Sequence, residues 1–247
     1  MRIAYFLILL FAFAACQPPK NNQGTSSVSV EDSIAAREAL FEKTDFLIGN
    51  SFKATDPDYL IYPLEIENHS EKKRKTSYSS NNYYENDIVN LVFYNYQTGV
   101  TSMLFPAQQV IITNPPYRAE NLLIEGNPQG KKSKLFYKVI FEDYTRDGTI
   151  NRRDPECLFM SYDDGTELVR LSPRDVDVFS WKFLDSTKTQ IEIRGLKDTD
   201  TIPEFDSEKD RAVILIVDIA NPDSAFELFP KPVQDSLKAL HIGRFVD

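Results

Sequence analysis

Residues 143–154 carry oxygen-bearing side chains at short, regular intervals around Gly148. The calcium ion prefers about six to eight hard oxygen ligands, and one concave loop can supply them. Glycine permits the sharp turn that such a loop needs. The predicted ligands are Asp143, Thr145, Asp147, Asn151 and Asp154 through their side chains and Thr149 through its main-chain carbonyl. We therefore predict a calcium-binding loop, with a polar Asp-Gly turn that binds no ion as the alternative.

This stretch resembles the twelve-residue calcium loop of EF-hand proteins, with Asp143, Asp147 and Asp154 at positions 1, 5 and 12. Position 12 is usually Glu in that family, and Asp there is similar to dockerin loops. Thr145 at position 3 lacks the charge of the usual Asp or Asn, and three arginines in the loop oppose a cation. The resemblance thus implies a weak site of the extracellular type, with a Kd of about 10⁻⁴–10⁻³ M.

The segments on both sides of this loop are typical of strands, because they are short, apolar and rich in aromatic residues. A helix–loop–helix sensor would need helices there, so we expect the loop to stabilise the fold and not to switch it. A second acidic stretch, residues 198–210, also lies between two expected strands. Asp198, Asp200 and Asp206 match positions 1, 3 and 9 of the same pattern, and Asp210 comes one residue after position 12. This is a second, weaker metal candidate, with a solvated acidic loop as the alternative.

The N-terminus has the features of an export signal. Arg2 precedes the apolar run 3–13, which is shorter than the ~20 residues of a membrane span but typical of a secretory signal. The run ends at Ala14-Ala15-Cys16, which resembles the lipobox of bacterial lipoproteins. In that family, cleavage precedes the cysteine, which then carries lipid. The resemblance implies a signal peptide at 1–15, a lipidated Cys16 and, from the polar sequence, a flexible tether at 16–30. The alternative is an ordinary signal peptide with a chance cysteine.

The residue after the cysteine bears on location. In lipoproteins of this kind, Asp at that position is a common inner-membrane retention signal, and this chain has Gln17. The resemblance therefore favours the outer membrane of a bacterial envelope, with the periplasmic and surface sides both open. If Cys16 is acylated, Cys157 is the only remaining thiol. Apolar residues follow it, so we expect a buried small side chain and not a nucleophile.

Composition excludes several classes of protein. The formal net charge of −9 disfavours nucleic-acid binding, which requires a basic face. Two histidines and two cysteines disfavour a His-rich zinc site and a disulfide framework. The chain has no Gly-x-Ser-x-Gly, His-Glu-x-x-His, Gly-rich phosphate loop or Cys-x-x-Cys motif. We also expect the single Trp181 to be a core aromatic, with sugar stacking as the alternative.

The body of the protein, residues 31–247, reads as one mainly β domain of antiparallel sheets with a short helix near each end. Good helix formers predict the first helix over 31–47, and Val233, Leu237 and Leu240 at helical spacing predict the second over 232–242. The expected strands are Tyr59–Ile66, Asn90–Tyr96, Ser102–Phe105, Val110–Thr113, Leu122–Ile124, Leu135–Glu142, Cys157–Tyr162, Glu167–Leu171, Val178–Leu184, Gln190–Arg194 and Ala212–Ile219.

Three segments share one sequence shape, in which an apolar strand, a turn and a second strand end in a proline. They span residues 91–106, 158–173 and 214–230. The middle copy, with Asp163-Asp164-Gly165 and then Leu171-Ser172-Pro173, resembles the repeat of TolB-like propeller proteins. That resemblance covers about sixteen residues and implies a propeller-like arrangement. The alternative is any antiparallel β domain with hairpins.

These observations predict a non-catalytic, lipid-anchored envelope protein. It would have a calcium-stabilised loop and would bind a protein or glycan partner. Two alternatives stay open. One is an envelope polysaccharide hydrolase, which would use two convergent carboxylates as acid and base. The other is a purely structural lipoprotein without a ligand.

Overall fold

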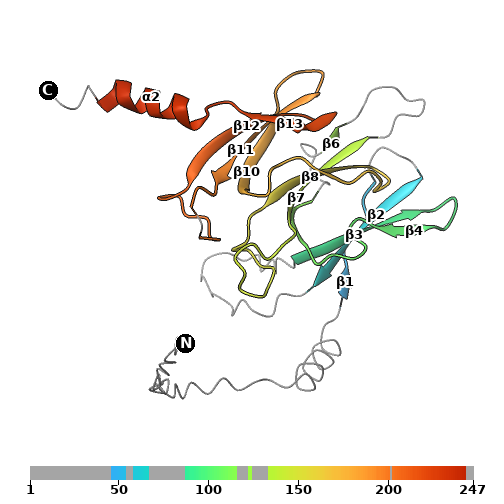
Figure 1. Cartoon of the computed structure of the whole chain (residues 1–247). Coiled ribbons are helices and arrows are strands. Elements are labelled where there is room, and N and C mark those ends of the chain that lie inside the picture. The colour runs from blue at the N-terminus through green and yellow to red at the C-terminus, as the bar shows by residue number, and fades with distance from the viewer. Residues whose placement is uncertain are drawn as a thin grey trace, which may run out of the picture. The chain divides into compact units, whose positions relative to one another are not determined.

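The computed structural model describes residues 46–53, 58–66, 87–115, 122–123, 133–200 and 202–242 (Figure 1). Every described residue lies in one compact unit of the chain, residues 44–247. The expected signal peptide, Cys16, the tether and residues 31–45 of the first expected helix lie outside the described residues. In the described part of the chain, no helix has the length and apolar character needed to cross a membrane.

The described strands form two antiparallel sheets, as the sequence predicts, and the expected C-terminal helix is present. The first sheet contains β1 (Phe46–Ile48), β2 (Tyr59–Ile66), β3 (Asp87–Asn95), β4 (Thr101–Met103), β5 (Ile111–Asn114), β6 (Leu122–Leu123), β7 (Lys134–Ile140), β8 (Cys157–Tyr162) and β9 (Val169–Arg170). The second sheet contains β10 (Val176–Phe183), β11 (Gln190–Lys197), β12 (Arg211–Asp218) and β13 (Asn221–Glu227), and it is followed by α2 (Lys231–Ile242).

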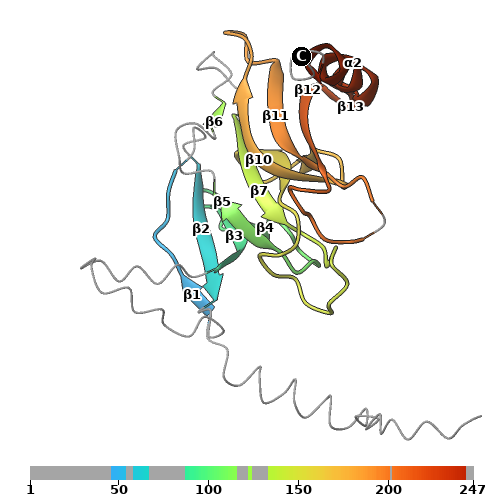
Figure 2. The same cartoon turned by 90° about the vertical axis from the view of Figure 1, so that its left-hand side faces the viewer.

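The order in the first sheet is β1-β2-β3-β5-β7-β8-β9, with β4 paired to β3 and β6 paired to β7. The second sheet follows chain order from β10 to β13. β7 and β8 contribute side chains to two hydrophobic cores. Figure 2 shows β7 between the other strands of the first sheet and β10 of the second. Tyr137 and Cys157 point into the core of the first sheet, whereas Phe136 and Leu158 join the core of the second sheet. Strands buried on both faces need largely apolar sequences, which explains the many apolar residues of β7 and β8.

Two secondary-structure predictions need correction. Residues 46 and 47, expected as the end of a helix, belong to β1, where Phe46 and Leu47 pair with Ile66 and Glu65. Tertiary pairing here overrides the helix propensity of the preceding segment. β13 was not expected, because its residues include Asn, Pro, Asp and Ser, which are poor strand formers. These residues are tolerated because β13 is the last strand of its sheet.

The three segments of similar sequence shape are three hairpins. β3 pairs with β4, β8 with β9 and β12 with β13, and a proline follows each hairpin. The first two hairpins turn at Gly99 and Gly165, which have φ values of 72° and 80°. L-residues with a side chain rarely adopt such values, so glycine is required there.

Cys157 and Trp181 occupy the environments that the sequence predicts. The Cys157 side chain is fully buried, and burial raises the pKa of its thiol to about 11. Trp181 stacks on the buried ring of Phe136 with 4.8 Å between ring centroids, at the margin of the second core. Both side chains thus have structural roles in packing.

Two acidic loops and the hollow beside them

The predicted calcium loop connects β7 to β8, and its first carboxylate organises the turn. Asp143 accepts hydrogen bonds from the main-chain N–H groups of Asp147 at 3.0 Å and Gly148 at 2.8 Å. Gly148 has a φ of 90°, which a residue with a side chain rarely adopts. The residue at position 1 of the calcium pattern therefore holds the loop in its turned form.

Asp154, at the other end of the pattern, closes the loop. Its side chain is only 3% exposed. One carboxylate oxygen accepts the main-chain N–H and the hydroxyl of Thr145, both at 3.0 Å, and the other accepts the N–H of Asn151 at 2.9 Å. Because the buried charge has three donors, its burial costs less than that of an isolated carboxylate.

Asp147 is engaged by neighbours in the same loop. Its Oδ1 accepts the hydroxyl and N–H of Thr149 at 2.7 and 3.0 Å, and the guanidinium of Arg153 forms an ion pair with its Oδ2. These hydrogen bonds, led by the Thr149 hydroxyl, lower the pKa of Asp147. The amide nitrogen of Asn151 also donates to Oδ2, at 3.2 Å. Arg153 thus occupies a position next to a predicted ligand, where its charge opposes a cation.

The second acidic loop connects β11 to β12 and closes in the same way. Asp210, 8% exposed, accepts the N–H of Thr199 on one carboxylate oxygen and that of Asp206 on the other, each at 2.9 Å. Asp210 therefore has the role in this loop that Asp154 has in the first. The two acidic loops therefore share one closing geometry.

Carboxylates converge in the second loop. Oxygens of Asp198, Asp200 and Asp210 all lie within 4.8 Å of one another. The predicted ligand Asp206 instead has its carboxylate beside the N–H of Glu208 at 2.9 Å and the ammonium of Lys209 at 3.3 Å. The three converging carboxylates fit a hard divalent cation better than the first loop does, because Asp147 of the first loop is already paired with Arg153.

The two loops contact each other. The hydroxyl of Tyr144 donates a hydrogen bond to Asp198 at 2.5 Å, and the rings of Tyr144 and Phe205 lie 5.3 Å apart at 38°. Burial, followed by the hydrogen bond to Asp198, raises the pKa of the Tyr144 phenol, which therefore stays protonated and donates. The contact connects an insertion of the first sheet to an insertion of the second.

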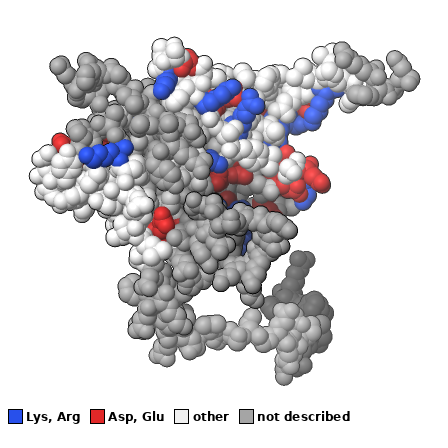
Figure 3. All heavy atoms as spheres, turned by 180° about the vertical axis from the view of Figure 1, so that it is seen from behind, with Lys and Arg blue, Asp and Glu red and all other residues white. Residues whose placement is uncertain are grey.

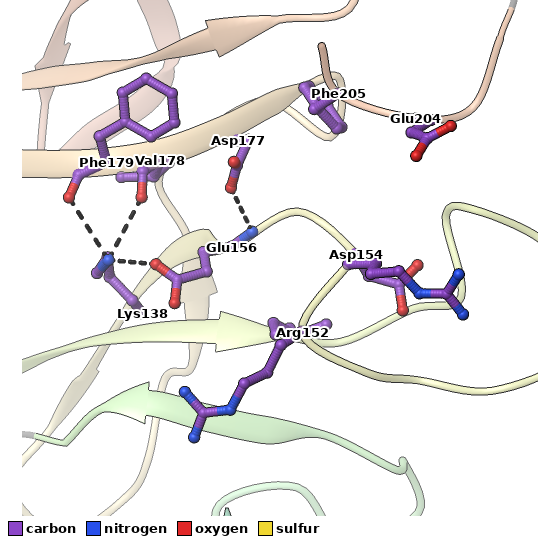
Figure 4. Close-up of a pocket in the computed structure, with 11 residues that line it drawn as sticks. Lys138, Arg152, Asp154, Glu156, Asp177, Val178, Phe179, Glu204 and Phe205 are labelled. Atoms are coloured by element: carbon purple, nitrogen blue, oxygen red, sulfur yellow. Dashed lines mark hydrogen bonds and ion pairs between the residues drawn. The ribbon is translucent and has the colours of Figure 1, made fainter. Parts of the chain in front are cut away.

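A hollow of about 670 Å³ lies beside this contact, between the loops and β10 (Figure 4). This volume is within the range of about 300–1,000 Å³ that is usual for ligand sites. Phe179 and Phe205 contribute aromatic surface to it. Its acidic side chains are Asp154, Glu156, Asp177 and Glu204.

A β-bulge builds the β10 wall of the hollow. Val178 pairs with Gly195, but Ser180 pairs with the adjacent Arg194, so Phe179 is an extra residue with no partner. Its side chain is 56% exposed at the hollow. The ammonium of Lys138 lies 3.5 Å from the carbonyl oxygens of both Val178 and Phe179. Bulges characteristically redirect one side chain in this way.

The charged groups that line the hollow, apart from Glu204, already have partners inside the protein. Lys138 forms an ion pair with Glu156, and Arg152 pairs with Asp87 at 2.9 Å. Asp177 accepts the N–H of Glu156 at 2.8 Å. Burial raises the pKa of Asp177, and the negative charge of Glu156 adds to the rise. The hollow therefore offers a ligand mixed polar and aromatic surface and little net charge.

The structure keeps the predicted residues of the first loop together and changes the set in the second loop. The side chains of Asp143, Thr145, Asp147, Asn151 and Asp154 form one hydrogen-bonded loop, as the sequence combines them, whereas Asp198 and Asp200 converge with Asp210 and not with Asp206. The sequence does hold a signal for Asp210, since Asp154 and Asp210 both lie at the end of an acidic stretch, shortly before a strand. The sequence has no comparable signal for the bulge at Phe179 or the contact of Tyr144 with Asp198.

Comparison of the chain with protein-family models, curated proteins and solved structures finds no match. The resemblances to lipoproteins, TolB-like repeats and EF-hand or dockerin loops therefore rest on the residues quoted for them.

Proposed function

We propose that this chain is a non-catalytic, lipid-anchored cell-envelope protein in which calcium stabilises two acidic loops beside a binding hollow. The observation that carries the proposal is the contact between those loops at Tyr144 and Asp198. An ion bound by either loop would also make the position of the other more rigid. The lipobox-like Cys16 and Gln17 support an anchor in the outer membrane, and the hairpin repeats are compatible with a TolB-like propeller.

Calcium has two candidate positions in this proposal. In loop 143–154, Asp143 and Asp154 already shape the loop, and an ion would compete with Arg153 for Asp147. In loop 198–210, three carboxylates face one another, and their repulsion favours a cation between them. We propose that the ion supplies only charge neutralisation and rigidity, because both loops connect paired strands.

The hollow is the proposed site for a protein or glycan partner. Phe179 and Phe205 offer apolar contact, and the surrounding ion pairs retain free donor and acceptor positions for hydroxyl or amide groups. Preformed pockets of this kind usually combine apolar walls with a few polar groups. Because Lys138 and Glu156 already neutralise each other, a neutral polar partner is a better fit than an ion.

An envelope polysaccharide hydrolase is the second candidate, since four carboxylates line the hollow and the pKa of Asp177 is raised. A general acid needs such a raised pKa. Release of reducing ends from a polysaccharide by the wild-type chain, lost in Asp177→Asn, would favour the hydrolase over the non-catalytic proposal.

A thermal melt of the processed chain, purified in detergent, tests the calcium proposal. With a Kd of about 10⁻³ M, calcium at about ten times that concentration should stabilise the chain by about 1.4 kcal/mol. At this chain length the melting temperature should rise by about 3–6 °C relative to the chelated sample. Absence of a rise would contradict the proposal.

Matched variants assign the ion to a loop. Asp143→Asn should abolish the calcium-dependent rise if the first loop binds, and Asp198→Asn should abolish it if the second loop binds. Asp185→Asn is the control, because Asp185 is an exposed carboxylate that caps a turn through Thr187 and Thr189. The anchor is tested separately by mass spectrometry of the N-terminal peptide, which should begin at an acylated Cys16. An unmodified residue there would contradict the anchor without affecting the calcium result.

A further inference from the structure

We propose that α2 and the turn before it lie on an anionic lipid surface, with the apolar side of the helix inserted among the headgroups and upper acyl chains. No residue of α2 is buried in the described structure. Val233, Leu237 and Leu240 are 42%, 45% and 72% exposed. A helix that packed only on its own protein would bury such a stripe, so these side chains require another apolar surface.

Most residues of α2 are divided between two faces, and the exception is the last residue, Ile242, which is 61% exposed and lies on the polar side. Val233, Leu237 and Leu240 are spaced by four and three residues, which places them on one side of the helix. Lys231 and Lys238 lie away from that stripe, on the polar side. An amphipathic helix with lysines opposite an apolar stripe is typical of segments that lie in the membrane interface. Its short length suits a surface position and excludes a span.

The exposed apolar surface continues into the preceding chain. Phe226, Leu228 and Phe229 are 55%, 42% and 41% exposed, at the end of β13 and the start of the turn. We call these three residues together with Val233, Leu237 and Leu240 the apolar end patch. Exposed apolar patches mark contacts with a membrane or another protein.

The patch is fixed to the second sheet. The side-chain amide of Gln234 donates hydrogen bonds to the carbonyl oxygens of Phe229 at 2.8 Å and Ala212 at 3.5 Å. These bonds tie the first turn of α2 both to the turn before it and to β12. The helix that carries the stripe is therefore held beside the turn that carries Phe229.

The charges of α2 favour an anionic lipid surface. The chain has a net charge of −9, whereas α2 has Lys231 and Lys238 against Asp235 alone. In Figure 3, Lys and Arg side chains lie along the upper part of the molecule, including the end toward the C-terminus, and most of the acidic side chains gather below them. An anionic bilayer would attract this end and repel the acidic loops. The choice of bilayer rests on the proposed anchor at Cys16, which would hold the chain beside a membrane. A single lipid chain binds only marginally, so a second membrane contact adds to retention.

Quenching of tryptophan by brominated lipid tests the proposal in the processed, full-length chain. Leu237→Trp places a fluorophore in the stripe, and Asp235→Trp places one about 200° around the helix from Val233. Asp235 has only an exposed ion pair with Lys231, so its replacement should not unfold the chain. The wild type, whose only tryptophan is Trp181, gives the background signal.

The vesicles contain equal amounts of phosphatidylcholine and phosphatidylglycerol, with bromines on the acyl chains. Leu237→Trp emission should shift to the blue and be quenched, whereas Asp235→Trp and wild-type emission should not change. Quenching should weaken when phosphatidylcholine is the only lipid. Equal quenching of the two variants would overturn the inserted face.

Vesicle flotation and sedimentation of the same samples separate this inference from the anchor. Flotation without quenching of Leu237→Trp would keep the anchor and overturn the α2 proposal. Absence of both flotation and quenching would contradict both. A dimer that Leu240→Asp dissociates, together with absent quenching, would assign the patch to a second copy of the chain and overturn the lipid contact.

Discussion

Tyr144 donates its phenol hydrogen to Oδ2 of Asp198 at 2.5 Å, across 54 residues of sequence. This bond connects the β7–β8 loop to the β11–β12 loop, and the ring of Phe205 packs beside the Tyr144 ring. The two acidic loops therefore form one structural unit, although they belong to different sheets.

Tyr144→Phe should destabilise the chain by about 1.5 kcal/mol, the lower end of the range for a hydrogen bond to a charged group. The lower end applies because the contact is only partly buried, and the ring packing on Phe205 is retained. Urea unfolding measures the change. Tyr96→Phe is the control, since that ring is 40% exposed and contacts Lys53 through its face. Equal stability of the two variants would show that the Asp198 bond contributes nothing.

Gly195→Ala should be among the more damaging changes near the hollow. A Cβ at Gly195 would lie 2.3 Å from the carbonyl oxygen of Asp177, a main-chain atom beside the bulge. Forcing extra volume into packed structure costs about 1–3 kcal/mol, and a backbone neighbour relaxes less than a side chain.

Gly99→Ala is the matched comparison. Gly99 has a φ of 72° but no atom within 4 Å of an added Cβ, so only backbone strain of about 1–2 kcal/mol is expected. Thermal unfolding should give Gly195→Ala a lower melting temperature than Gly99→Ala. The reverse order would mean that the β10 bulge is soft and not a fixed wall.

The sequence predicts different amounts of the fold and of the site. β2 and β8 are predicted with their observed bounds because their apolar runs are bordered by polar turns. β1 and β13 are missed because pairing with β2 and β12, and not their own composition, makes them strands. Within the site, Asp143 and Asp154 act inside one loop, so local spacing reveals them.

The remaining features of the site depend on distant contacts. Tyr144 meets Asp198 only after the two sheets pack, and no local pattern encodes that distance. Phe179 enters the hollow because β10 has one residue more than β11 at the bulge, which strand alternation does not reveal. Lys138 lies in an apolar strand, and its partner Glu156 follows the acidic loop.

Asp177 should make the chain less stable as pH rises. Burial raises its pKa, so the folded chain holds the proton more tightly than the unfolded chain does. Its contribution is fully present below the unfolded pKa of about 3.9 and is lost as pH rises through the higher folded pKa. Asp177→Asn removes this loss while its amide oxygen still accepts the N–H of Glu156.

Urea unfolding at pH 4 and pH 7 measures this difference, using assay conditions on the two sides of the expected titration. Asp177→Asn should gain stability relative to wild type as the pH rises. Asp223→Asn, on the exposed side of β13, should show no such gain. A wild-type advantage that grows toward neutral pH would contradict the destabilising role of the buried carboxylate.

Asp200→Asn should have effects of opposite sign with and without calcium. Without the ion, the carboxylates of Asp198, Asp200 and Asp210 repel one another within 4.8 Å, and removal of one charge should stabilise the chain. Asp200 is exposed, so the gain should be about 0.2–1 kcal/mol. The amide oxygen of the variant still accepts the N–H of Ile202, which keeps the turn intact. With calcium present, the variant lacks a charged ligand and should be less stable than wild type.

Thermal melts in chelator and in calcium measure both signs of the change in stability, and the melting temperature of Asp185→Asn should shift equally in the two conditions. A variant that is less stable than wild type in chelator would mean that the three carboxylates do not repel, and the second loop would then lose its physical reason to bind a cation.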